Sequence, residues 1–142
     1  MLSCEYMVDD KIRILFMDDE EYIRDIAEQI LLFFGYEVTL ASDGKQAFEK
    51  YRDAFKVNCA HDVIIMDVGI PSGWGAKKAM QEIIDFDKKA CGLVSSGYLD
   101  DPLVLDFSRY HFKGILPKPY EMDEVNSVIS NIIKLVGLRK DR

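Results

Sequence analysis

The feature that most constrains this chain is an apolar run at residues 63–66 that leads directly into Asp67. The run holds a valine, two isoleucines and a methionine, and Gly69 and Pro71 follow it. A short β-branched run of this kind is typical of a strand that is buried on both faces of a parallel sheet. Asp67 is then expected at the carboxyl end of that strand, where ligands bind in open α/β sheets. Aspartates also cap helices and form turns, so Asp67 alone leaves a purely structural role open.

Composition places the chain among ordinary globular proteins. It has 142 residues, of which 49% are hydrophobic and 30% are charged, which suits one domain with a sizeable core. The net charge of -7 disfavours direct binding to nucleic acid, because phosphates carry the same sign. No apolar run approaches the roughly 18 residues that a membrane span needs, and residues 1–10 lack the pattern of a signal peptide.

The three cysteines bear on the cellular compartment. Cys4, Cys59 and Cys91 are odd in number and far apart, with neither metal-ligand spacing nor a disulfide framework. Together with the lack of a membrane span, this predicts a protein of the reducing cytoplasm without membrane contact.

Other short apolar runs alternate with amphipathic segments along the chain. Besides the run that ends at Asp67, strands are expected at residues 12–17, 37–41, 91–95 and 114–116. Helices are expected up to Phe34, from Ser42 or Asp43 to Phe55, at residues 76–84, from Asp100 or Asp101 through Tyr110, and at residues 125–136. Five strands that alternate with five helices predict a parallel α/β sandwich.

Polar residues follow four of the five predicted strands. Asp18 and Asp19 follow the first strand, Asp67 the third, Ser96 the fourth and Lys118 the fifth. Parallel strands bring their carboxyl ends to one edge, where three carboxylates repel one another unless a cation lies among them. Oxygen ligands of this kind suit Mg²⁺. The lysine and the serine hydroxyl complete a phosphoryl-binding site in which Asp67 is a nucleophile that forms an aspartyl phosphate.

These segments resemble the receiver domain of two-component response regulators. The resemblance covers about residues 11–137 and rests on residues 14–20, residues 64–71 with Gly75, residues 94–97 and residues 116–119. It implies a flavodoxin-like (βα)5 fold of three layers, with a five-stranded parallel sheet in the order 2-1-3-4-5. The receiver domain is then flanked by an N-terminal arm at residues 1–10 and a C-terminal tail at residues 138–142.

The resemblance also implies a role for each polar residue at this edge. Asp67 is the phosphoacceptor. Asp18 and Asp19 are the acidic pair, with Asp19 the more direct Mg²⁺ ligand and Asp18 acting partly through water. The backbone carbonyl of Gly69 is a further metal ligand, and Lys118 contacts the phosphoryl oxygens.

The family also has a switch hydroxyl, for which Ser95 and Ser96 are the candidates. The family usually places this hydroxyl 22 residues before the lysine, and Ser96 stands at that distance from Lys118. The peptide bond between Lys118 and Pro119 is expected to be cis, as is typical of the family and cheap for a bond that precedes proline.

The chain departs from the family pattern at two positions. Ile115 stands where the family often has a tyrosine or phenylalanine that rotates as a switch. Trp74 stands in a loop position where a small or acidic residue is usual. The first departure questions the aromatic switch, and the second indicates either a binding surface or a side chain packed over the loop.

The predicted function is a phosphoacceptor receiver domain in a two-component phosphorelay. A histidine kinase or a histidine phosphotransfer protein donates the phosphoryl group to Asp67 in a Mg²⁺-dependent reaction. Phosphorylation then switches the binding of the domain to a downstream protein target. Such a domain is not an enzyme beyond assisting its own phosphorylation and dephosphorylation. We expect a monomer or weak dimer, either a single-domain regulator or a receiver from a hybrid kinase.

Two alternatives stay open at this stage. One is a pseudo-receiver that is not phosphorylated and only binds partners. The other is an aspartate-nucleophile phosphatase of the haloacid dehalogenase type, which needs an acid two residues after the nucleophile, where this chain has Gly69.

Overall fold

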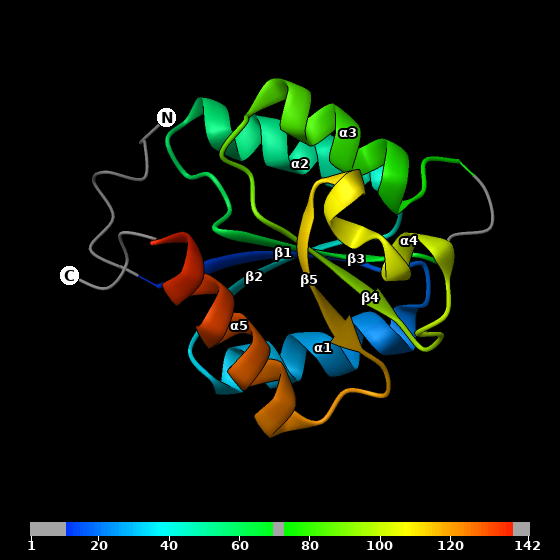
Figure 1. The fold of residues 1–142 in the computed structure, drawn as a ribbon. Helices are drawn as coiled ribbons and strands as arrows, with labels where there is room; N and C mark the ends of the chain where they lie inside the picture. Colours follow the sequence, from blue (N-terminus) through cyan, green and yellow to red (C-terminus); the bar gives the residue numbers. More distant parts are fainter. Residues whose placement is uncertain (1–10, 70–72, 138–142) are drawn as a thin grey trace.

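The computed structural model of the chain describes residues 11–69 and 73–137, and the predicted arm and tail lie outside these described residues. Its centre is a five-stranded parallel sheet in the order β2-β1-β3-β4-β5 (Figure 1). The strands are β1 (Arg13–Met17), β2 (Glu37–Ala41), β3 (Val63–Asp67), β4 (Gly92–Ser96) and β5 (Phe112–Pro117). The predicted flavodoxin-like strand order is confirmed.

Helices cover both faces of the sheet and make three layers (Figure 1). α1 (Glu21–Phe33) and α5 (Met122–Val136) cover one face, while α2 (Gly44–Lys56) and α3 (Ala76–Phe86) cover the other. α4 (Pro102–Leu105) and the 3-10 helix η2 (Phe107–Tyr110) lie on the same side as α3. Two apolar cores result, one on each face of the sheet.

β1, β3 and β4 lie in the interior of the sheet because their side chains are mostly apolar on both faces of the strand. Every residue of β1, β3 and β4 is buried, as a strand covered by helices on both faces requires. Residues that alternate along a strand point to opposite cores: Val94 belongs to the α2–α3 side, whereas Leu93 belongs to the α1–α5 side.

Local signals set several of the helix ends. Gly35 follows α1 with φ 87°, a left-handed conformation that glycine adopts without strain. Of the two cap candidates for α2, the structure uses Asp43, whose side chain accepts a hydrogen bond from the Gln46 N–H at 2.8 Å. Asp101 caps α4 in the same way.

The predicted fourth helix is wrong in its extent. The sequence predicted one helix through Tyr110, but α4 is a single turn that ends at Leu105. Asp106 then leaves helical geometry with φ -127° and ψ 46°, and η2 follows. Leu105 is 71% exposed and Val104 is the buried residue of α4, so this segment lacks the apolar stripe that stabilises a longer helix. β5 also begins earlier than predicted, at the buried Phe112.

The cysteines depart from expectation as well. Cys59 is disulfide-bonded, whereas Cys91 is a free, buried thiol. The expectation of no disulfide is therefore wrong, because distances along a sequence do not show which cysteines meet in the fold. Within residues 11–69 and 73–137, no helix has both the length and the apolar character that crossing a membrane requires.

Trp74 packs over the start of α2. Its carbonyl accepts a hydrogen bond from the Gly44 N–H at 2.9 Å, and a Cβ at position 44 would lie only 2.6 Å from that oxygen. The indole ring lies 5.8 Å from the Phe48 ring, and the Lys78 ammonium lies 4.7 Å over it. Of the two interpretations of Trp74, the structure shows the packed side chain.

Candidate functional site

The carboxyl ends of four strands meet at one edge of the sheet and bring the predicted residues together. Asp67 ends β3, Ser96 ends β4, and Lys118 directly follows β5. These three residues and Asp19, which follows β1, line an open cleft of about 580 Å³. Asp18 is fully buried and bonded to Lys118. The sheet topology therefore assembles all five residues from distant parts of the chain.

Lys118 joins two of the carboxylates. Its Nζ donates a hydrogen bond to Asp18 Oδ2 at 2.8 Å and another to Asp67 Oδ1 at 3.0 Å. Burial alone would lower the pKa of Lys118, but the bonds to the two carboxylates outweigh it and raise the pKa above its usual value. Lys118 is therefore a fixed positive charge beside Asp67.

Asp67 is only 6% exposed, and the groups around it shift the pKa of its carboxyl in opposite directions. Burial raises the pKa of its carboxyl, the hydrogen bond from Lys118 works against this, and the charge of Asp18 adds to it. The net direction is upward. The Lys118 ammonium does not fully offset burial and the charge of Asp18, so the site favours a further positive charge.

The acidic residues form a group with the chemistry of a metal site. Asp18, Asp19 and Asp67 each offer a carboxylate oxygen, and these oxygens lie within 4.8 Å of one another. Asp18 is committed to the protein on both oxygens, because Oδ1 accepts from the Glu20 N–H at 3.0 Å and Oδ2 accepts from Lys118. Asp19 is exposed and lines the cleft. Hard oxygen ligands of this kind fit Mg²⁺.

A residue that the sequence analysis missed supports this acidic loop. Arg24 of α1 donates a hydrogen bond from Nη1 to the carbonyl oxygen of Asp18 at 2.7 Å. The N–H of Asp18 donates to the Ala41 carbonyl on β2 at 3.1 Å. Side chains on a helix lean toward its N-terminus, so an arginine in the second turn of α1 was the available signal.

Gly69 lies beside the phosphoacceptor candidate. It is exposed, lines the cleft and makes a backbone hydrogen bond that lowers the pKa of Asp67. Because Gly69 has no side chain, its backbone is accessible from the cleft next to the Asp67 carboxylate. A metal-binding role of its carbonyl stays a prediction.

The two serine candidates face opposite sides of β4. Ser96 lines the cleft, and its Oγ accepts a hydrogen bond from the Tyr98 N–H at 2.9 Å. Ser95 Oγ instead lies 2.6 Å from the hydroxyl of Tyr120, which packs with the α1–α5 core. Alternation along the strand thus places Ser96 at the cleft and Ser95 behind it. The bond between Lys118 and Pro119 is cis, as expected.

The fold and the acidic cleft together define a receiver domain of two-component signalling. The model of the response regulator receiver domain matches residues 14–130, so the chain belongs to that family. Receiver domains are signalling domains. The chain is 30% identical over 122 residues to chemotaxis protein CheY of Bacillus subtilis, an alignment that covers 85% of this chain and 97% of CheY.

One further relative and one solved structure are also similar to this chain. Regulatory protein AtoC of Escherichia coli is 24% identical over 129 residues, which is 91% of this chain but only 27% of AtoC. Response regulator protein TrrA of Thermotoga maritima, solved in complex with Mg(2+)-BeF, is 26% identical with a TM-score of 0.72. That match covers 84% of this chain and 97% of TrrA.

Proposed function

We propose that Asp67 accepts a phosphoryl group from a histidine kinase or a histidine phosphotransfer protein, and that phosphorylation changes the affinity of the domain for a downstream protein. One observation carries the proposal: the Lys118 ammonium lies 3.0 Å from Asp67 and 2.8 Å from Asp18 at the cleft. This arrangement pairs a nucleophilic carboxylate with a fixed cation that can bind the incoming phosphoryl oxygens.

The chemistry follows from the positions of these groups. A carboxylate oxygen of Asp67 forms the new O–P bond while the P–N bond to the donor imidazole breaks, and the electron pair stays on the imidazole nitrogen. Lys118 exchanges its carboxylate contacts for phosphoryl oxygens. The Ser96 hydroxyl, now bonded to the backbone of Tyr98, turns to donate to the phosphoryl group.

We propose Mg²⁺ as the cofactor because three converging carboxylates with a single ammonium fit a divalent cation. Asp19 and Asp67 would hold it directly with the carbonyl of Gly69, and Asp18 would act partly through water. When bound, the ion neutralises the carboxylates and the phosphoryl oxygens together. The Mg(2+)-BeF complex of TrrA supports this choice.

The remaining expectations follow from the proposed role. The receiver domain spans about residues 11–137 and is a monomer or a weak dimer in the cytoplasm, where it meets its kinase. It contacts neither nucleic acid directly nor the membrane. Whether it works alone or within a hybrid kinase, its partners are the phosphoryl donor and one downstream protein.

Incubation of the purified protein with acetyl phosphate and Mg²⁺ tests the proposal. We expect intact-mass spectrometry to show one added phosphoryl group that acid and hydroxylamine remove. A pseudo-receiver stays unmodified under these conditions. A phosphatase instead turns over p-nitrophenyl phosphate many times without accumulating a stable phosphorylated form.

The variant Lys118→Ala separates phosphoryl contact from metal binding. We expect phosphorylation by acetyl phosphate to slow by roughly 100-fold, as when a preorganised donor is removed from a transition state. Mg²⁺ affinity should stay equal or rise, because the ammonium that competes for Asp18 and Asp67 is gone. The two quantities are measured by mass spectrometry and by amide-shift titration. A variant that loses Mg²⁺ binding but keeps its rate contradicts this division.

The pair Ser96→Ala and Ile115→Val tests which residue drives the response. Ile115 is a partly buried β-branched residue packed against the α2–α3 core, so it has no ring to rotate and few rotamers. We expect Ile115→Val to cost about 0.5–1.5 kcal/mol of stability and leave the response intact. Ser96→Ala should remove most amide-shift changes that beryllofluoride causes in residues 97–100. The reverse pattern would show that position 115 is the switch.

A further inference from the structure

Tyr120 lies behind the cleft and bonds to the residue next to Ser96. Its hydroxyl lies 2.6 Å from Ser95 Oγ, and Ser95 is fully buried. Burial raises the pKa of Tyr120 to about 12, so the phenol stays neutral and keeps its proton at physiological pH. The roles proposed above leave this contact unused.

Three of the strands that carry the cleft residues meet at Tyr120. Its ring lies edge-on to Phe16 of β1, with centroids 5.9 Å apart, two residues before Asp18. Its hydroxyl bonds to β4, and the residue itself follows Lys118 by two positions after β5. A displacement of Tyr120 therefore also moves the strand ends that carry the acidic pair, Ser96 and Lys118.

The backbone connects Ser95 to the reacting groups. The Val68 N–H, next to Asp67, donates to the carbonyl of Ser95 at 3.2 Å. The Lys118 N–H donates to the carbonyl of Ser96 at 3.0 Å. The end of β4 thus lies between the phosphoacceptor and the lysine, so the position of Ser95 sets that of both neighbours.

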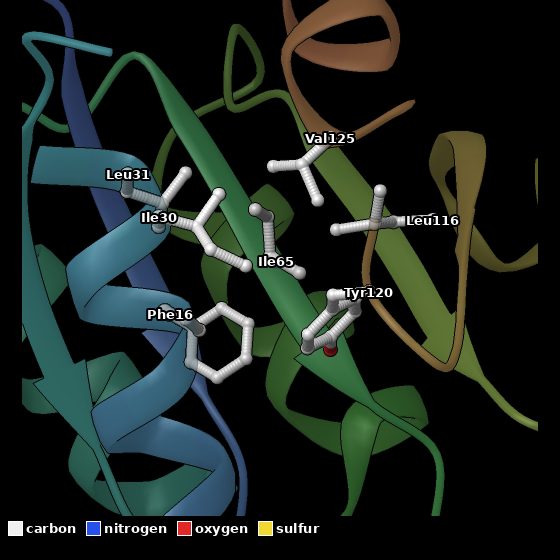
Figure 2. Close-up of a pocket in the computed structure, with 8 residues that line it drawn as sticks. Phe16, Ile30, Leu31, Ile65, Leu116, Tyr120 and Val125 are labelled. Carbon is white, nitrogen blue, oxygen red and sulfur yellow. The ribbon is translucent and has the colours of Figure 1, made fainter. Parts of the chain in front are cut away.

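The cavity beside the ring offers no polar partner among the described residues that line it. Figure 2 shows Tyr120 among apolar side chains of the strands and of α1 and α5, with its oxygen turned away from Leu116 and Val125. The cavity beside it is about 10 Å³, and the seven residues that line it with Tyr120 are all apolar. A space that small holds about one water at most, and an apolar lining gives that water too few partners.

We infer that Tyr120 is a positioning residue of this site, whose hydrogen bond to Ser95 fixes Ser96 and Lys118 relative to Asp67. The inference rests on the proposed function for the reaction that it positions, but the geometry itself can be tested without that reaction. If Tyr120 loses its hydroxyl, the fully buried Ser95 hydroxyl loses this partner, and if Ser95 loses its hydroxyl, the phenol loses the same bond. In both cases the end of β4 relaxes.

The experiment compares Tyr120→Phe, Ser95→Ala and the double variant with Tyr36→Phe. Tyr36 is the matched control, because it is a buried tyrosine of the same core whose hydroxyl also bonds to a side chain, Asn126 Oδ1 at 2.9 Å. We measure the backbone amide shifts of the unphosphorylated proteins, their Mg²⁺ affinity and their rate of phosphorylation by acetyl phosphate.

We expect Tyr120→Phe and Ser95→Ala to shift the amides of Ser96 and Lys118 alike, while Tyr36→Phe leaves both amides in place. Each single variant should slow phosphorylation by about 5-fold, and the double variant by no more than about twice that, because both changes remove one interaction. Mg²⁺ affinity should change less than about 2-fold, since the carboxylates lie on other strands.

Unshifted amides of Ser96 and Lys118 would overturn the inference, as would effects that multiply in the double variant or an equal slowing in Tyr36→Phe. A wild-type protein that acetyl phosphate does not modify would instead overturn the proposed function. In that case the amide shifts still decide whether Tyr120 positions the two residues.

Discussion

Asp67→Asn is expected to abolish phosphorylation by acetyl phosphate while the domain stays folded. Asparagine keeps the shape of the side chain but lacks the anionic oxygen that forms the O–P bond. Other acids do not replace it, because Asp18 is fully buried with both oxygens bonded, and Asp19 and Glu20 of the cleft follow β1, not β3. Intact-mass spectrometry with acetyl phosphate and Mg²⁺ is the measurement, and undiminished modification of this variant would refute the assignment.

The stability of the Asp67→Asn variant shows whether phosphorylation is lost because the nucleophile is missing and not because the domain unfolds. The pKa of Asp67 is raised in the folded protein, so its ionised form costs stability at every pH above the unfolded value. Asparagine removes that charge, and its amide oxygen can still accept from Lys118. We therefore expect a melting temperature at neutral pH that is equal or higher. Asp53→Asn, an exposed position on α2, is the control that should keep full phosphorylation.

The fold and the residues that line the cleft could be predicted from the sequence. Apolar runs that end in polar residues fixed the strands, and parallel topology then required Asp67, Ser96 and Lys118 to meet at one edge. The preference for Ser96 over Ser95 came from family spacing, and the alternation of side chains along β4 places Ser96 at the cleft. Its role as the switch stays a prediction. These patterns involve residues close together in the sequence, so they can be recognised without knowledge of the packing.

Features that depend on packing between distant segments could not be predicted. α4 ends at Leu105, whose side chain is exposed, and the helical periodicity of the sequence is weak there. The disulfide of Cys59 depends on proximity in space. The contact of Tyr120 with Ser95 joins residues 25 positions apart, whose hydroxyl groups carry no recognisable motif. Long-range polar contacts of this kind leave almost no trace in a single sequence.

Asp19→Ala is expected to weaken Mg²⁺ binding strongly. Of the acidic pair, Asp19 has the exposed carboxylate, whereas both oxygens of Asp18 are bonded within the protein. The variant therefore removes the most accessible negative charge from the three-carboxylate group. Loss of an indirect metal partner typically costs 10–100-fold in affinity, so a direct ligand should cost at least about 10-fold.

Amide-shift titration with Mg²⁺ measures this loss directly and without a phosphoryl donor. Asp85→Ala is the control, because it removes the same charge from an exposed position near the end of α3, whereas the cleft lies where the helices begin. We expect the control to bind Mg²⁺ as the wild type does, which separates a local ligand from the net charge. Phosphorylation of Asp19→Ala should recover in part as Mg²⁺ is raised, since Asp67 and Lys118 are still in place. Equal Mg²⁺ affinity in wild type and Asp19→Ala would mean that the ion is held without Asp19.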